Sequence, residues 1–151
     1  MNDMDYMRLA IAQAQQAAAR GEVPVGALLV KGEKVIAMGG NSPVALHDPT
    51  AHAEILAMRA AGTALGNYRL DDTVLYVTLE PCLMCAAAMV HARVRRMVFG
   101  AFDPKAGAAG GLIDAFALKG LNHRVDVFGG VLEKECGQLL SDFFAATRQG
   151  A

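Results

Sequence analysis

The sequence lacks tryptophan, has only three cysteines, and has neither acidic nor basic charge in large excess. An odd number of cysteines argues against a disulfide framework, and free thiols suit a reducing compartment, so we expect a cytoplasmic protein. A formal net charge of −1 excludes tight non-specific nucleic-acid binding through charge alone. No apolar run approaches the roughly 18 residues of a membrane helix, and none resembles a signal peptide, so we expect no membrane contact.

Charged residues are also scarce, at 19% of the chain against about 25% in an average soluble domain. Hydrophobic residues make up 54%, and a length of 151 residues suits one hydrophobic core. We therefore expect residues 1–151 to form a single domain. Because little charge is available to cover the surface, we also expect a second subunit to cover part of it.

Short apolar runs alternate with longer helix-like segments, which predicts an α/β fold. Helices are expected over residues 4–19, 50–62, 81–93 and 133–148, and strands over 25–30, 35–38, 73–78, 97–100 and 125–128. Two prolines predict a loop over residues 42–49, and glycines and alanines predict a mobile loop over 103–111. The alternation predicts a three-layer α/β/α sandwich around a mixed sheet of about five strands.

Two short motifs carry candidate metal ligands, His52-Ala53-Glu54 and Pro81-Cys82-Leu83-Met84-Cys85. One imidazole and two thiolates can hold zinc and leave its fourth position open for water, as catalytic zinc sites do. Residues two apart lie about 200° around a helix, so His52 and Glu54 can share a pocket only at a helix start. We expect Thr50 to cap that helix, and the two motif helices to lie side by side, each after a central strand.

A structural zinc site is the main alternative to a catalytic one, and it requires a fourth protein ligand. The remaining candidates for that ligand are Cys136, His47, His91 and His123. A structural site would give Glu54 no function. The presence of Glu54 therefore favours a catalytic zinc site in which Glu54 transfers protons. A zinc-stabilised RNA-binding module without turnover remains an alternative.

His-x-Glu followed by Pro-Cys-x-x-Cys is typical of zinc-dependent base deaminases. Beyond these motifs, the chain resembles the bacterial tRNA-specific adenosine deaminases of the cytidine/deoxycytidylate deaminase superfamily. The segments that carry the resemblance are Glu22–Ala27, His47–Ile55, Asn67–Leu70, Leu75–Cys82, Asn122–Val125 and Ser141–Phe144. The resemblance implies a cytidine-deaminase-like fold, a homodimer, and hydrolysis of adenosine to inosine at the wobble position of the tRNA anticodon.

The same resemblance implies roles for particular residues. One zinc ion per subunit would be held by His52, Cys82 and Cys85, with Glu54 catalytic. The base would contact Val23, Pro24, Asn41 and Ala53, with Glu80 close to the zinc site. The anticodon stem-loop would contact His47, Asp48, Asp103, Lys105, Phe143, Phe144 and Arg148, although each of these also has an ordinary structural interpretation.

Two features depart from the family pattern. Relatives often carry several basic residues after the Phe-Phe pair, whereas Arg148 is the only one here. Phe102 is a bulky apolar residue immediately before Asp103. Neither change touches the zinc motifs, but both bear on how strongly tRNA is held. A small-molecule deaminase acting on guanine, cytosine or a nucleotide shares the zinc motifs and remains an alternative function.

Overall fold

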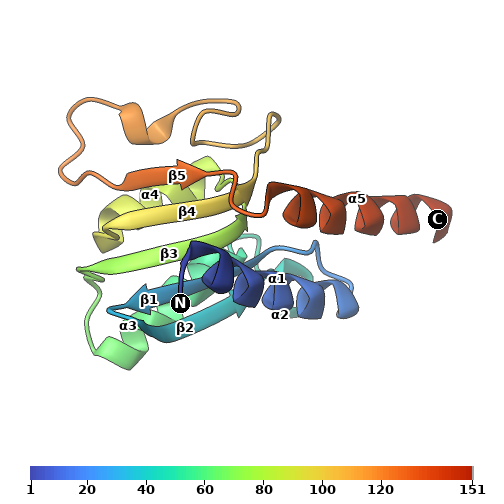
Figure 1. Ribbon diagram of the computed structural model, residues 1–151, viewed down its shortest axis with the longest axis horizontal. Helices are drawn as coiled ribbons and strands as arrows, with labels where there is room; N and C mark the ends of the chain where they lie inside the picture. Colours follow the sequence, from blue (N-terminus) through green and yellow to red (C-terminus); the bar gives the residue numbers. More distant parts are fainter. Residues whose placement is uncertain (151) are drawn as a thin grey trace.

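The computed structural model describes residues 1–150 and shows one five-stranded sheet between two layers of helices (Figure 1). The elements in chain order are α1 (Asp3–Ala19), β1 (Gly26–Lys31), β2 (Lys34–Gly40), α2 (Pro43–Leu46), α3 (Ala53–Leu65), β3 (Thr73–Leu79), α4 (Leu83–Ala92), β4 (Arg96–Ala101), the 3₁₀ helix η1 (Ala115–Ala117), β5 (Asp126–Gly129) and α5 (Glu133–Gly150). Within the described residues, none of the helices combines the length and hydropathy that a membrane crossing requires.

The sheet has the strand order β2-β1-β3-β4-β5 and is mixed, as predicted. β1 runs antiparallel to β2 and β3, whereas β3, β4 and β5 run parallel to one another. The carboxyl ends of the three parallel strands therefore lie at one edge of the sheet. Because α4 follows β3 and α5 follows β5, both helices begin at that edge.

Alternate residues of the central strand β3 point to the two helical layers. Leu75 and Val77 pack with residues of α3 and α4, including Met89. Tyr76 faces the opposite side and packs with residues of α1 and α5, including Met7. Both faces are covered, which explains why β3 is a nearly continuous apolar run and confirms the predicted three-layer architecture.

The start of α3 differs from the prediction. The amide and hydroxyl groups of Thr50 both donate to Asp48 Oδ1, at 2.9 and 2.7 Å, so Thr50 closes a turn and does not cap the helix. His52 is the N-cap, and the helix continues past Gly62 until Gly66 adopts a left-handed conformation with φ 64°. Glycine accommodates this conformation without a steric cost, so it ends the helix.

Two predicted loops are more ordered than expected. Residues 42–49 contain the short helix α2, whose Val44 and Ala45 amides donate to the buried Glu22 carboxylate. Residues 103–111, predicted to be a mobile loop, are instead held by many hydrogen bonds, such as the 2.8 Å bond from the Ala108 amide to the Pro81 carbonyl. The helix predicted from Pro81 begins two residues later, with Cys82 as its N-cap.

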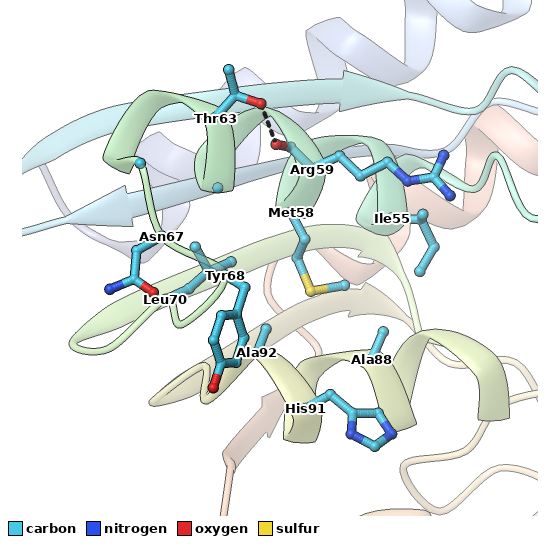
Figure 2. A pocket seen from close by; sticks show the side chains of 12 residues that line it. Ile55, Met58, Arg59, Thr63, Asn67, Tyr68, Leu70, Ala88, His91 and Ala92 are labelled. Carbon is cyan, nitrogen blue, oxygen red and sulfur yellow. Dashed lines mark hydrogen bonds between the residues drawn. The ribbon is translucent and has the colours of Figure 1, made fainter.

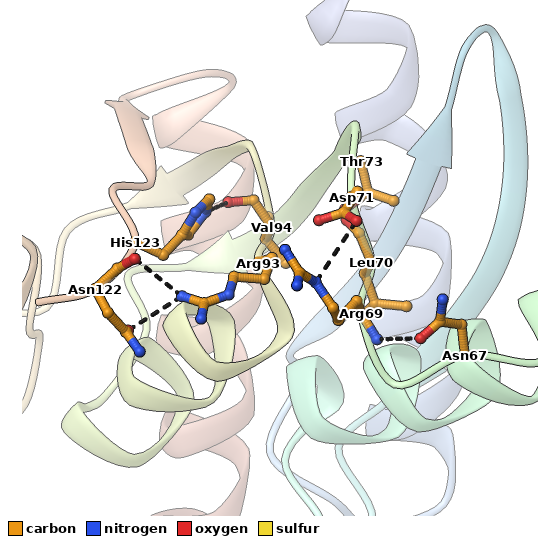
Figure 3. A network of polar contacts seen from close by, with 9 residues as sticks. All are labelled: Asn67, Arg69, Leu70, Asp71, Thr73, Arg93, Val94, Asn122 and His123. Carbon is orange, nitrogen blue, oxygen red and sulfur yellow. Dashed lines mark hydrogen bonds and ion pairs between the residues drawn. The ribbon is translucent and has the colours of Figure 1, made fainter.

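Two of the family-like segments meet at the carboxyl end of α4 (Figure 3). The Leu70 amide donates to the Ala92 carbonyl at 2.6 Å. Arg93 donates to the backbone and side-chain oxygens of Asn122, and the His123 ring bonds to the Val94 carbonyl at 2.7 Å. These contacts fasten the loops around α4, so Asn122 and His123 have structural partners at the opposite end of the helix from Cys82.

Candidate active site

Three predicted metal ligands, His52, Cys82 and Cys85, converge in space. His52 Nδ1 lies 3.5 Å from each sulfur, and the three ligand atoms all lie within 4.8 Å of one another. A nitrogen about 2.0–2.1 Å and a sulfur about 2.3 Å from a tetrahedral zinc ion would themselves be about 3.5 Å apart. The group is positioned to bind a metal ion, and its donor chemistry and spacing fit zinc.

No other His, Cys, Asp or Glu within residues 1–150 joins this group. Cys136 is buried in the layer on the far side of the sheet. His47 and His91 are exposed, and His123 bonds to a backbone carbonyl. None of the four alternative ligands therefore completes a closed structural site.

The ligands are held by the amino ends of two helices. His52 is the N-cap of α3, Cys82 is the N-cap of α4, and Cys85 lies in the first turn of α4. Helix amino ends carry partial positive charge, which favours thiolates. The two helices share a layer as predicted, but only α4 follows a central strand, because α3 comes after the edge strand β2 and α2.

Glu54 sits beside this group with only 4% of its surface exposed. Burial raises the pKa of Glu54 above its ordinary value. The hydrogen bond from the Cys85 thiol lowers the pKa of Cys82 to about 4, and a hydrogen bond with Cys82 raises the pKa of His52. A buried carboxyl group that retains a proton more readily, beside a soft metal-binding group, is suited to proton transfer.

A cavity of about 220 Å³ opens onto two of the metal ligands, His52 and Cys82. It is lined by Val23, Val25, Asn41, His52, Glu54, Leu79, Glu80, Cys82, Asp103 and Ala106. Pockets for drug-sized ligands measure roughly 300–1,000 Å³, so this cavity suits a single base better than a whole nucleotide. The rest of a larger substrate would remain outside.

The structure places the predicted base-contacting residues in two groups. Val23 and Asn41 line the cavity, as does Asp103, which was predicted to contact the anticodon loop. Pro24 is buried and does not line the cavity. Ala53, whose backbone was the predicted contact, is buried between the lining residues His52 and Glu54. Sequence reasoning missed Val25, Leu79 and Ala106 as lining residues, since apolar and small side chains carry no chemical signal.

The remaining predicted anticodon contacts lie outside the cavity. His47 and Lys105 are exposed, and Asp48 is bonded to Thr50. Phe143, Phe144 and Arg148 lie on α5, which begins at the active-site edge and projects beyond the sheet (Figure 1). Phe102 packs edge-on against Phe99 with ring centroids 4.9 Å apart, so it does not enter the cavity.

Comparison with known proteins identifies the family. A model of the MafB19-like deaminases matches residues 1–148. The chain is 48% identical over 148 residues to a tRNA-specific adenosine deaminase of Haemophilus influenzae, covering 97% of this chain and 86% of that protein. It is also 48% identical over 144 residues to a tRNA-specific adenosine deaminase of Bacillus subtilis, covering 95% and 89%. The chain belongs to the tRNA-specific adenosine deaminases.

Solved structures agree with this deaminase assignment. One, from work on A-to-I editing by tRNA:A34 deaminases at the wobble position, matches with a TM-score of 0.88 and 48% identity over 90% of this chain and 99% of that one. A guanine deaminase from Nitrosomonas europaea matches with a TM-score of 0.81 over 94% of this chain and 84% of that one. Its identity is 24%, so it supports the deaminase fold alone.

A larger groove of about 760 Å³ lies between α3 and α4 of this deaminase (Figure 2). Its walls include Met58, Tyr68, Leu70, Ala88 and His91, and it contains none of the metal ligands. No carboxylate or thiol lines it. The smaller cavity, with its metal ligands and buried acid, is therefore the candidate active site.

Proposed function

We propose that this deaminase hydrolyses adenosine to inosine at the wobble position of a tRNA anticodon, releasing ammonia. The observation that carries the proposal is the opening of one base-sized cavity onto both Glu54 and the metal-binding group. Its near full-length relatives at 48% identity are named as tRNA-specific adenosine deaminases, which supports tRNA as the substrate. Residues 1–151 act as a single deaminase domain, in the cytoplasm, where its thiols stay reduced.

The metal is zinc, one ion per subunit, held by His52 Nδ1 and the sulfurs of Cys82 and Cys85. When bound, zinc supplies Lewis acidity that lowers the pKa of water from about 15.7 toward about 7. Glu54 takes a proton from the attacking water and gives it to N1 of adenine as the water oxygen bonds to C6. Glu54 then takes the proton of the new C6 hydroxyl group and delivers it to the departing amine, so that inosine and ammonia are the products.

The cavity walls position the base beside Glu54 and the metal-binding group. Val23, Val25 and Leu79 supply apolar contact. The Asn41 side-chain amide lines the cavity and forms no hydrogen bond with the described residues, so it is available to donate to and accept from the base or ribose. The target nucleotide must be splayed out of the anticodon loop to enter a cavity of this size.

The anticodon stem-loop lies over the outer rim of the cavity. The contacts we propose are His47, Asp48, Asp103, Lys105, Phe143, Phe144 and Arg148. Asp103 lies at the cavity wall, and the exposed Lys105 follows in the same segment. The last three reach the RNA from α5, which projects from the edge where the cavity opens.

The deaminase works as a homodimer, in which the outer face of α4 contacts a second copy. Leu83, Leu118 and Leu121 are each at least 41% exposed and surround an apolar hollow of about 140 Å³. His91 lines both this hollow and the larger groove between α3 and α4, so the two hollows adjoin. Light scattering tests the proposal: Leu83→Glu should give monomers, whereas Met4→Glu on α1 should not change the wild-type mass.

The activity is tested by incubating zinc-loaded protein with a tRNA transcript that carries A at the wobble position. Inosine is read as G on reverse transcription, so an A-to-G change at that position alone supports the proposal. Glu54→Gln serves as the inactive control. Conversion of free guanine, cytosine or a nucleotide, with the transcript unchanged, would favour the small-molecule alternative.

A further inference from the structure

Glu80 is a buried carboxylate whose contacts the proposed chemistry does not use. It follows the last residue of β3 and is 2% exposed. Its Oε1 accepts the Asp103 amide at 2.9 Å, and its Oε2 accepts the amides of Ala109 and Gly111 at 2.9 and 2.8 Å. Among the described residues no Lys, Arg or His forms an ion pair with it. Both oxygens are thus occupied by backbone N–H groups.

The segment held by Glu80, residues 103–111, forms part of the active-site cavity. Asp103 and Ala106 line that cavity. Asp103 Oδ1 accepts the amides of Lys105 and Ala106 at 3.0 and 3.2 Å, and the Asp103 carbonyl accepts the Gly107 amide at 2.9 Å. The segment therefore folds as a compact turn. Asp103 and Ala106 lie at the cavity, and Asp103, Ala109 and Gly111 bond to Glu80.

Two glycines allow the segment to approach the carboxylate this closely. A Cβ atom at Gly111 would lie 2.8 and 2.9 Å from the two carboxylate oxygens of Glu80. A Cβ atom at Gly107 would overlap the Glu80 carboxyl group. The middle and the last residue of this segment therefore both lie tightly against Glu80.

Only a glutamate satisfies these donors. A glutamine at this position would turn an NH₂ group toward backbone N–H groups and leave at least one of them without an acceptor. An aspartate is one methylene group shorter and falls short of the same amides. Glu80 also lies outside the metal-binding group, and its occupied oxygens leave it poorly placed to carry protons.

We propose that Glu80 is a positioning residue, which fixes residues 103–111 as one wall of the substrate cavity. It thereby governs how tightly the tRNA nucleotide is held. It takes no part in metal binding or bond breaking. The kinetic part of this inference rests on the proposed function. The structural part, that Glu80 protects the segment, does not depend on the substrate.

The decisive variant is Glu80→Gln, prepared with zinc and compared with wild type and with Asp3→Asn, a change on α1 far from the cavity. Amide hydrogen exchange should become faster at Asp103, Ala109 and Gly111, and zinc content should stay as in wild type. KM for the tRNA transcript should rise about 10- to 100-fold, because a displaced wall misplaces the nucleotide, while kcat changes much less. Asp3→Asn should leave exchange in this segment and KM unchanged.

Gly111→Ala provides a second route to the same displacement and keeps the test decisive if Glu80→Gln does not fold. It should raise KM and speed exchange in the same segment. The double variant should raise KM by less than the product of the two single effects, since both changes disturb the contact of this segment with Glu80. Gly111→Ala also crowds the Asp103 carbonyl oxygen. Wild-type exchange and KM in both single variants would overturn the proposal, as would loss of zinc or a fall in kcat at unchanged KM. Inactivity of the wild type on tRNA would instead contradict the proposed function. The hydrogen-exchange measurements would then still test the structural role of Glu80.

Discussion

A Cβ atom at Gly39 would lie 2.8 Å from the carbonyl oxygen of Ala53, closer than a real Cβ atom approaches such an oxygen. The backbone of β2 therefore rests directly on the first turn of α3. That turn follows His52 and contains Glu54, so the position of both side chains depends on the absence of a side chain in the neighbouring strand.

Gly39→Ala should push the start of α3 away from the sheet. We expect overpacking of this kind to lower the free energy of unfolding by about 1–3 kcal/mol and to weaken zinc binding. Urea unfolding and a zinc titration measure the two effects. Gly137→Ala on α5 is the matched control, because a Cβ there meets nothing within 4 Å. It should raise stability by about 0.5–1 kcal/mol, and an equal gain from Gly39→Ala would contradict the contact.

Replacing Glu54 by glutamine keeps the shape of the side chain and removes its ability to exchange protons. We expect turnover to fall by about 10²- to 10⁴-fold, with zinc content as in wild type. Turnover on the tRNA transcript and metal analysis of the purified protein measure both quantities. A variant that lost its zinc would show that Glu54 supports the metal site and does not carry protons.

Removal of the metal should abolish activity and lower the thermal midpoint, because an ion that binds only the folded protein stabilises it. At a free concentration of 1,000 times Kd, the stabilisation is about 4.1 kcal/mol. Chelation followed by differential scanning calorimetry tests this, and added zinc should restore both properties. Cys82→Ala should imitate chelation, whereas Cys136→Ala, across the sheet, should keep its metal. Equal zinc affinity in the two variants would remove Cys82 from the ligand set.

Asp3 should contribute a pH-dependent stabilisation. Its carboxylate accepts two hydrogen bonds from Arg96, at 3.0 and 2.7 Å, and these lower the pKa of Asp3 below its ordinary value of 3.8. A lowered folded-state pKa gives stability that is present above the unfolded pKa and is lost as pH falls through the folded pKa. Asp3→Asn should therefore cost about 1 kcal/mol at pH 7 for this partly exposed pair, and less at acid pH.

Urea unfolding of wild type and Asp3→Asn at neutral and acid pH measures the difference between their free energies of unfolding. Release of metal at acid pH affects both proteins alike and cancels in this difference. Arg8→Ala is the comparison, since its ion pair with Asp5 is more exposed and should contribute little at any pH. A constant difference between wild type and Asp3→Asn from neutral to strongly acid pH would show that the Arg96 interaction does not depend on the charge of Asp3.

The metal group was predictable because its information is local. Cys82 and Cys85 lie three residues apart at a helix start, and His52 carries its neighbouring acid two residues later, so short motifs describe most of the site. The strands were predictable for a similar reason, since β3 is a run of β-branched and apolar residues that is buried on both faces.

Features that depend on distant partners were not predictable. Thr50 is a good capping residue by type, but Asp48 competes for its hydroxyl and amide groups, so the cap moves to His52. α2 depends on Glu22, whose carboxylate accepts amides 22 and 23 residues away. The order of residues 103–111 likewise comes from Glu80, which is separated from its three donors by 23, 29 and 31 residues.

Glu80 accepts its hydrogen bonds from main-chain amides of the segment that it holds, and this bears on how the enzyme can change over generations. The side chains of Pro104, Lys105 and Ala106 are exposed and take no part in the hydrogen bonds to Glu80. Selection can therefore vary these side chains while the backbone keeps its conformation. Laboratory evolution toward other nucleobases or other polynucleotides would find tolerant sites there, whereas Gly107 and Gly111 should resist replacement.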